Sequence, residues 1–282
     1  MDTDMTHLAR TRKLSPAARF WRDDALPFIE ARQVEDGREL CYARHSHETF
    51  SIGVITRGES TYINREVHLR VCEGTVVLMN PGDVHACNPI DGLPWSYVML
   101  YVDAAWLGGL QQALGLSEGP GLQPLSAIMS LDRPMYEGVV QLYGVLTDDA
   151  LCVEDKQAAA TAFFTRMLRT LETAPLSQSE AHDKLQRAAA FMQEHCAQAL
   201  KIDDICAAAE LSPSYLTRAF KKLYGMTPHA FLLNQRVQLA RLLLKRGEPL
   251  AEVALASGFA DQAHFQRAFK QLLAATPGQY KG

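Results

Sequence analysis

Residues 202–231 have the sequence IDDICAAAELSPSYLTRAFKKLYGMTPHAF, and residues 250–280 have the related sequence LAEVALASGFADQAHFQRAFKQLLAATPGQY. The tetrapeptide RAFK occurs in both, and each copy ends in a Thr-Pro pair followed three residues later by an aromatic residue. An internal repeat of this kind indicates one supersecondary unit used twice. The repeat therefore decides the fold of the last third of the chain.

Each copy predicts a short Ala-rich helix, a tight turn and a second helix. The first helices are expected at 202–209 and 250–257. Ser212, followed by Pro213, and Asp261 are residue types that cap helix N-termini, so they should begin the second helices. The sequence thus predicts two helix-turn-helix units.

The second helix of each copy has two different faces. Leu216, Phe220 and Leu223 recur at the spacing that buries one side of a helix. The opposite face carries hydroxyl, amide and basic groups without an acid, which suits base edges and phosphates in DNA. A solvated surface would explain one such helix. Two copies joined by a predicted helix at 228–245 favour DNA binding.

This C-terminal block resembles the DNA-binding domain of the AraC/XylS family. The resemblance covers residues 185–280, and Glu210 and Ala274 depart from it where the family commonly has glycine. It implies base contacts by Ser214, Thr217 and Arg218 in the first unit and by Gln262, Ala263, Gln266 and Arg267 in the second. It implies phosphate contacts by Lys221, Lys222 and Lys270.

The charge of the chain is unevenly distributed. The 282 residues carry a net charge of −4, yet residues 182–282 hold 13 Lys and Arg against 8 Asp and Glu. Only this part suits a polyanionic partner. The sequence shows no long apolar run, no secretory signal and no Cys-x-x-Cys motif among its six cysteines. We therefore expect a cytoplasmic protein with no membrane segment.

Residues 22–102 predict a sandwich or small barrel of β-strands. Turn signals such as Arg57-Gly58 and Pro81-Gly82 separate short apolar or alternating runs. The runs lie at 28–34, 40–47, 49–56, 60–64, 66–70, 74–80 and 95–102. With the helices that follow, the predicted fold class is α+β, with a β-barrel domain ahead of an all-α DNA-binding domain at 182–282.

His45-Ser46-His47 and Pro81-Gly82-Asp83-Val84-His85 resemble the two motifs of the cupin barrel. In cupin enzymes such histidines hold a metal together with a glutamate, but Ser51 occupies that position here. Two interpretations remain open. The histidines are hydrogen-bonding groups around a ligand cavity and no cofactor is needed, or they bind a divalent metal such as zinc or nickel with Cys87 nearby.

AraC-type regulators often carry a cupin-like effector domain before the DNA-binding domain. The resemblance implies an effector pocket for a small polar metabolite, such as an amino acid. Ordinary barrel core is the alternative for its aromatic members. Residues 1–21 are either an arm that closes over the ligand or an unstructured leader. The candidate effector-binding residues are His45, His47, His85, Trp95, Tyr97, Tyr42 and Asn88.

Residues 103–172 predict three helices, at 103–116, 134–148 and 153–172, before a polar linker at 173–181. The last helix has an apolar stripe that includes Phe163, Phe164 and Met167. This stripe either packs on its own domain or forms the interface of a homodimer, as the family resemblance implies.

The leading hypothesis is a ligand-responsive, sequence-specific transcriptional regulator and not an enzyme. Its expected partners are operator DNA, a small effector, a second copy and, if it is an activator, RNA polymerase. The alternatives are a metal-dependent cupin enzyme or metal sensor fused to a DNA-binding domain, and an architectural DNA-binding protein whose barrel only dimerises.

Overall fold

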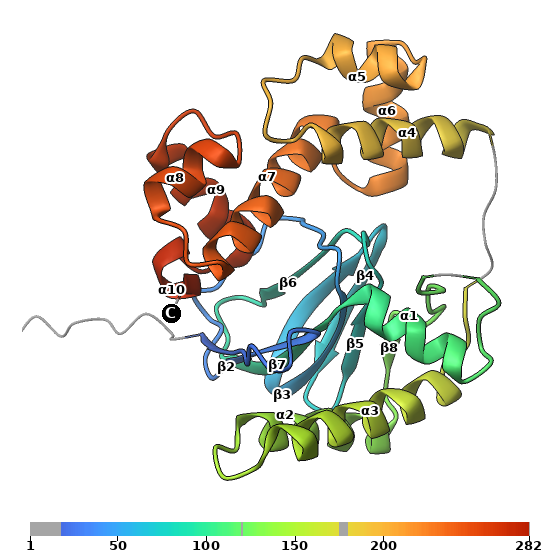
Figure 1. Cartoon of the computed structure of the whole chain (residues 1–282), viewed down its shortest axis with the longest axis vertical. Coiled ribbons are helices and arrows are strands. Elements are labelled where there is room, and N and C mark those ends of the chain that lie inside the picture. Colours follow the sequence, from blue (N-terminus) through green and yellow to red (C-terminus); the bar gives the residue numbers. More distant parts are fainter. Residues whose placement is uncertain (1–17, 120, 175–179, 282) are drawn as a thin grey trace, which may run out of the picture.

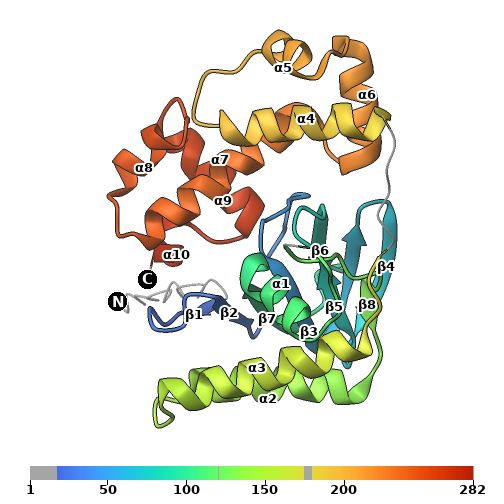
Figure 2. The same ribbon diagram turned by 45° about the vertical axis from the view of Figure 1, so that its right-hand side comes forward.

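The computed structural model describes residues 18–119, 121–174 and 180–281, which form three layers (Figure 1). A barrel-like sheet lies in the middle, and the C-terminal helices cover one end of it. Helices α2 (Arg133–Thr147) and α3 (Val153–Thr170) run together along the opposite side (Figure 2). The predicted α+β class, with a β-rich N-terminal part and a helical C-terminal part, is confirmed.

The central sheet is antiparallel, with the strand order β1-β2-β7-β3-β5-β8, and β4 and β6 pair with the far half of β3. Helix α1 (Ala104–Ala113) follows the seventh strand. The strands are β1 (Arg19–Trp21), β2 (Ile29–Val34), β3 (Phe50–Asn64), β4 (Val67–Cys72), β5 (Val76–Met79), β6 (His85–Pro89), β7 (Trp95–Val102) and β8 (Met129–Ser130).

The turn predicted at Arg57-Gly58 is wrong, because the runs at 49–56 and 60–64 form one strand of 15 residues, β3. The pairing of β3 with β7 shifts between Ile55 and Arg57, which is a β-bulge. Gly58 has a φ of +72°, and a Cβ there would lie 2.1 Å from the Pro94 carbonyl oxygen. The bulge and the glycine bend the strand without ending it.

The strand predicted at 40–47 is also wrong. Within this segment only an isolated bridge joins His45 to His85. The Ala43 N–H donates to the Gln271 carbonyl at 2.9 Å, so its hydrogen bond goes to the C-terminal helices and not to the sheet. The predicted arm at 1–21 ends in the sheet, since β1 pairs with β2. Its residues 1–17 lie outside the described residues.

The predicted C-terminal helices are confirmed. The Ser212 hydroxyl accepts from the Tyr215 N–H, and the Asp261 carboxylate accepts from the His264 N–H, so both second helices begin at the expected caps. The helices are α4 (Glu180–Glu194), α5 (Ile202–Ala209), α6 (Pro213–Tyr224), α7 (Pro228–Lys245), α8 (Leu250–Ala256), α9 (Gln262–Leu273) and α10 (Pro277–Lys281).

The apolar stripe of α3 belongs to the core of its own domain. Phe163, Phe164 and Met167 are at most 5% exposed and pack in one cluster with the barrel residues Ile52 and Leu100. Of the two expected roles of the stripe, packing on its own domain is the one observed. The predicted linker at 173–181 lies mostly outside the described residues. In the part of the chain that is described, no helix is long and apolar enough to cross a membrane.

Candidate effector cavity and DNA-binding face

The two predicted DNA-reading helices stand at opposite ends of the connecting helix α7 (Figure 1). Phe220 of α6 and Phe269 of α9 are fully buried on the inner faces. The outer faces carry no acid in the first turn of either helix. All ten predicted DNA-contacting residues are exposed: Ser214, Thr217, Arg218, Lys221, Lys222, Gln262, Ala263, Gln266, Arg267 and Lys270.

A narrow cavity occupies the interior of the barrel. The centres of water molecules can reach about 30 Å³ of it, which is room for a few waters. Met99 and Tyr101 also line it, although the sequence analysis did not single them out. Their alternation with Tyr97 along β7 was the available signal, because every second residue of a strand faces the same side. Five predicted effector residues line this cavity: Tyr42, His45, His85, Trp95 and Tyr97.

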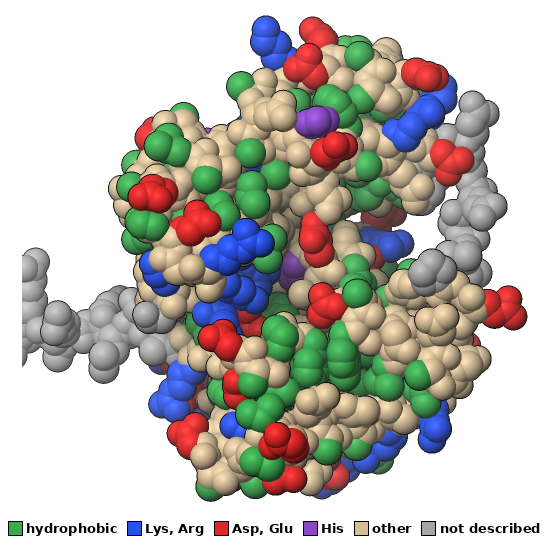
Figure 3. Space-filling model, viewed as in Figure 1, with side chains coloured by type: hydrophobic (Ala, Val, Ile, Leu, Met, Phe, Trp, Pro, Cys, Tyr) green, Lys and Arg blue, Asp and Glu red, His purple; other side chains and the backbone are tan. Residues whose placement is uncertain are grey.

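The other two predicted effector residues lie elsewhere. Asn88 holds the backbone of Tyr42: its Oδ1 accepts from the Tyr42 N–H at 2.6 Å, and its Nδ2 donates to the Tyr42 carbonyl at 3.1 Å. His47 lines a wider cleft between the barrel and the C-terminal helices, together with Arg241 and Lys245 of α7. Figure 3 shows Lys and Arg side chains gathered beside this hollow.

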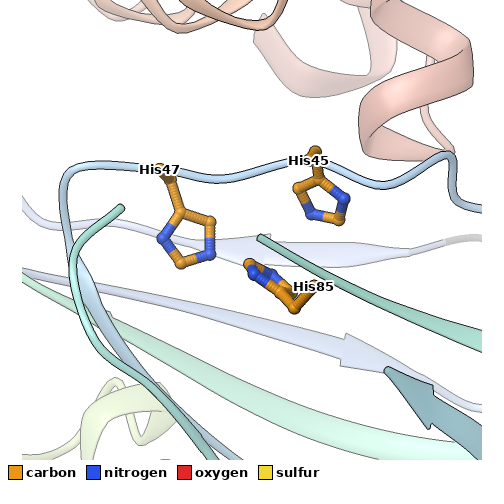
Figure 4. A group of neighbouring side chains, drawn as sticks. All are labelled: His45, His47 and His85. Carbon is orange, nitrogen blue, oxygen red and sulfur yellow. The ribbon is translucent and has the colours of Figure 1, made fainter. Parts of the chain in front are cut away.

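Three histidines meet between the cavity and the cleft (Figure 4). The ring centroids of His45 and His85 are 4.4 Å apart, and those of His47 and His85 are 4.8 Å apart. One ring nitrogen of each lies within 4.8 Å of the others. The three Nδ1 atoms lie 2.9–3.0 Å from the carbonyl oxygens of Ala43, Thr49 and Asp83.

These hydrogen bonds fix the form of each imidazole. A carbonyl oxygen only accepts, so each Nδ1 carries the proton and each Nε2 is left as an acceptor or metal ligand. Burial lowers the pKa of all three histidines below the usual value, and the rings are neutral near pH 7. The Ser51 hydroxyl lies 3.3 Å from the His47 Nε2, at the position where cupin enzymes have glutamate.

Residues 43–47 connect the cavity to both helix-turn-helix units. The Ala43 N–H donates to the Gln271 carbonyl in α9, and the Arg44 guanidinium donates to the Gly225 carbonyl, at 3.4 Å, at the end of α6. The Ser46 carbonyl accepts from the Asn234 amide of α7 at 2.9 Å. The histidines of the same segment point inward (Figure 4).

A buried ion cluster joins the barrel to α7. The Glu30 carboxylate of β2 accepts from the Arg22 Nε at 3.0 Å and forms ion pairs with Arg241 and Lys245. Burial alone would raise the pKa of Glu30, but the three cations outweigh it and lower the pKa to about 2. No local sequence pattern indicates this cluster, because Glu30 and the α7 residues Arg241 and Lys245 are far apart along the chain.

A family model described as the AraC-like ligand binding domain matches residues 30–194. The chain belongs to the AraC family. A second model, described as a helix-turn-helix domain, matches residues 205–282. This AraC-family chain is therefore a ligand-responsive transcriptional regulator, with an effector-binding N-terminal domain and a DNA-binding C-terminal domain.

Related proteins agree with this assignment along most of the chain. The uncharacterized HTH-type transcriptional regulator YbfI of Bacillus subtilis is 25% identical over 225 residues, 79% of this chain and 81% of its own. The transcriptional activator RhaS of Salmonella schwarzengrund is 25% identical over 243 residues, 83% of this chain and 85% of its own. ToxT from Vibrio cholerae shares the fold, with a TM-score of 0.57 at 13% identity over 90% of this chain and 98% of ToxT.

Proposed function

We propose that the effector binds in the barrel cavity, among His45, His85, Trp95 and Tyr97, and that residues 43–47 transmit its binding to the DNA-binding units. The observation that supports this most directly is the double role of that segment. Its histidine side chains face the candidate site, while the Arg44 side chain donates to Gly225 at the end of α6 and the Ala43 N–H donates to Gln271 in the last turn of α9. A ligand that displaces the segment by a fraction of an ångström would therefore change how both units are held.

A thermal-shift screen tests this proposal. Metal-free protein is screened against sugars, amino acids and organic acids, and each hit is repeated with operator DNA selected from a random pool. We expect a specific hit that raises the melting temperature, changes operator affinity and is lost in His85→Ala. The matched control is His229→Ala, an exposed histidine on α7. A hit that His85→Ala binds normally would place the effector elsewhere.

On DNA, we propose that α6 and α9 enter successive stretches of the major groove. Arg218 and Arg267, with the hydroxyl and amide side chains of the same helices, would read bases, and Lys221, Lys222 and Lys270 would contact phosphates. The exposure of all these side chains on acid-free helix faces supports the assignment.

We also propose a homodimer. A groove between α2 and α3, lined by Gly138, Gln141, Val145 and Ala162, offers a place for a helix of a second copy, and Val140 nearby is 40% exposed. Sedimentation equilibrium should show a dimer that Ala162→Arg dissociates. A monomer at micromolar concentration would reject it. If the protein is an activator, it would also contact RNA polymerase, which transcription in vitro can test.

The histidine trio favours a second candidate, a metal sensor. The residues fit a divalent metal such as zinc or nickel, because three neutral rings present their Nε2 atoms toward one another and backbone carbonyls orient them. Calorimetric titration with zinc and nickel tests it, with His47→Ala as the variant expected to lose binding. A metal-binding barrel with enzymatic activity is the least supported alternative, since Ser51 replaces the glutamate.

A further inference from the structure

Arg32, in the middle of β2, is a buried arginine with unused hydrogen-bonding capacity. Its side chain is 1% exposed. The Nη1 atom donates to the carbonyl oxygen of Leu273 at 2.9 Å. The Nε and Nη2 atoms are also buried and form no hydrogen bond of normal geometry with the described residues, although the nearby Tyr101 hydroxyl interacts with the guanidinium and, against the effect of burial, raises its pKa. Buried guanidinium nitrogens are normally paired, so this pair of donors calls for an acceptor.

Strand register shows that Arg32 faces the barrel interior. In the pairing of β2 with β7, Arg32 lies opposite Met99 and Val34 lies opposite Tyr97. Opposed residues of antiparallel strands point to the same side of the sheet. Met99 and Tyr97 line the cavity, and the guanidinium carbon is 5.5 Å and 6.0 Å from the ring centroids of Tyr42 and Tyr97. The guanidinium therefore packs against Tyr42 and Tyr97, two residues that line the cavity, and a ligand must pass between these rings to reach its donors.

The charge of Arg32 is not balanced by an acid of the described chain. The neighbouring carboxylate on β2, Glu30, is engaged by Arg22, Arg241 and Lys245. The rings over which Arg32 lies are those of Phe20, Tyr42 and Tyr97, and none of them carries a negative charge at pH 7. Burial raises the pKa of the Tyr97 phenol well above its usual value. An unbalanced buried cation is costly, and an anion in the cavity would relieve this cost.

We propose that the effector carries a carboxylate and that Arg32 binds it through Nε and Nη2. Two parallel N–H groups of a guanidinium match the two oxygens of a carboxylate. This inference rests on the proposed effector site and narrows its ligand to an acid. The flexible side chains of Met79 and Met99, which line the cavity, can move to admit the rest of the ligand.

The same guanidinium holds the DNA-reading helix α9. Leu273 is the last residue of α9, and its carbonyl is one of those that the helix itself leaves unbonded. A cation at a helix C-terminus also interacts favourably with the helix dipole. A carboxylate on Arg32 would share this charge with α9, so an acidic effector acts on the helix directly as well as through residues 43–47.

A matched series of acids and amides tests the proposal on the full chain. Formate, acetate, butyrate, octanoate and benzoate are compared with their primary amides by thermal shift and calorimetry at pH 7.5 and constant ionic strength. We expect at least one carboxylate to bind, with its amide at least tenfold weaker. Arg32→Gln should weaken carboxylate binding at least tenfold, and Arg32→Lys should weaken it less. Arg70→Gln, an exposed arginine of β4, should bind as the wild type does.

The outcomes are distinct. Failure of every carboxylate to bind, or equal binding of an acid and its amide, overturns the proposal. If Arg32→Gln does not fold, the proposal is still tested in two ways. These are the comparison of each acid with its amide on the wild type and the binding of the acids to Arg32→Lys. If a neutral compound binds in a His85-dependent manner and no acid does, the effector site stands and only the carboxylate inference fails. If nothing binds, both fail.

Discussion

At the scale of single residues, the proposed DNA contacts are side chains that are exposed at the surface of the folded chain. Arg218 and Arg267 occupy equivalent positions in the two copies of the repeat, and both are exposed. Neither forms an ion pair with the described residues. An arginine that is free in the absence of DNA can give its full donor set to a guanine edge or to a phosphate.

Replacing Arg218 or Arg267 by alanine should weaken binding to the selected operator by about 1–3 kcal/mol if the arginine reads a base. Fluorescence anisotropy at fixed salt measures this loss. The control is Arg133→Ala, an exposed arginine on α2 that makes the same change in net charge. Unchanged operator affinity would show that the substituted arginine does not contact a base. A wild-type affinity that does not fall with salt would contradict phosphate contacts.

At the scale of elements, both departures from the family pattern are strained helix ends. Glu210 and Ala274 have φ angles of +55° and +48°, at the C-caps of α5 and α9. Glycine adopts this left-handed conformation without a steric penalty, whereas a residue with a Cβ does not. Glu210 and Ala274 therefore adopt the left-handed conformation that glycine commonly provides at these positions in the family.

The variant Ala274→Gly should raise the free energy of unfolding by about 1 kcal/mol, because it relieves the left-handed strain. The variant Ala207→Gly, at an exposed position inside α5, should lower it by about 1 kcal/mol because glycine weakens a helix interior. Chemical denaturation measures both. Equal destabilisation by the two substitutions would show that Ala274 carries no strain.

Residues 43–47 form a second element whose role can be isolated. Asn234 of α7 is fully buried and bonds both backbone groups of Ser46. In Asn234→Ala, we expect the effector to bind within a few-fold of the wild-type affinity, while its influence on operator binding largely disappears. Titration of operator DNA with and without effector measures the coupling, with His229→Ala as control. A full response in Asn234→Ala would exclude this route.

At the scale of the whole molecule, a buried ion cluster joins the two domains. Glu30 is 3% exposed and Arg241 is 7% exposed, so each depends on the other for neutralisation. Replacing Glu30 by glutamine leaves a buried cation without its anion, which should cost about 3 kcal/mol. We expect Glu30→Gln to separate the domains, with a larger radius of gyration in small-angle scattering. Glu59→Gln, which removes an exposed ion pair with Arg70, should not change it.

The same cluster predicts a dependence on acid. The pKa of Glu30 is about 2 in the folded chain and 4.5 as the ordinary value that the unfolded chain would have. The ionised carboxylate therefore stabilises the fold fully above pH 4.5, and this stabilisation is lost as the pH falls toward 2. The wild type should lose roughly 3 kcal/mol more than Glu30→Gln over this interval. If the free energy of unfolding fell by the same amount in both proteins between pH 5 and pH 2.5, Glu30 would not be the group responsible.

The sequence by itself determined the helices of the C-terminal domain and which face of each is buried. Caps such as Ser212 and Asp261, and the apolar spacing around Phe220 and Phe269, act within one or two helical turns, so a local pattern records them fully. The sequence also predicted that three histidines lie close together at one end of the barrel, because they belong to two short motifs that resemble those of cupins.

Only the tertiary structure decided which groups join the two domains. Residues 43–47 have the alternation of a strand, but Ser46 bonds to Asn234, 188 residues further along the chain. The burial of Arg32, with two donors that form no hydrogen bond of normal geometry, depends on Leu273 and on strand pairing that no local pattern specifies. Sequence periodicity records which face of an element is apolar; it does not record which distant group lies against that face, because the folded chain as a whole sets that contact.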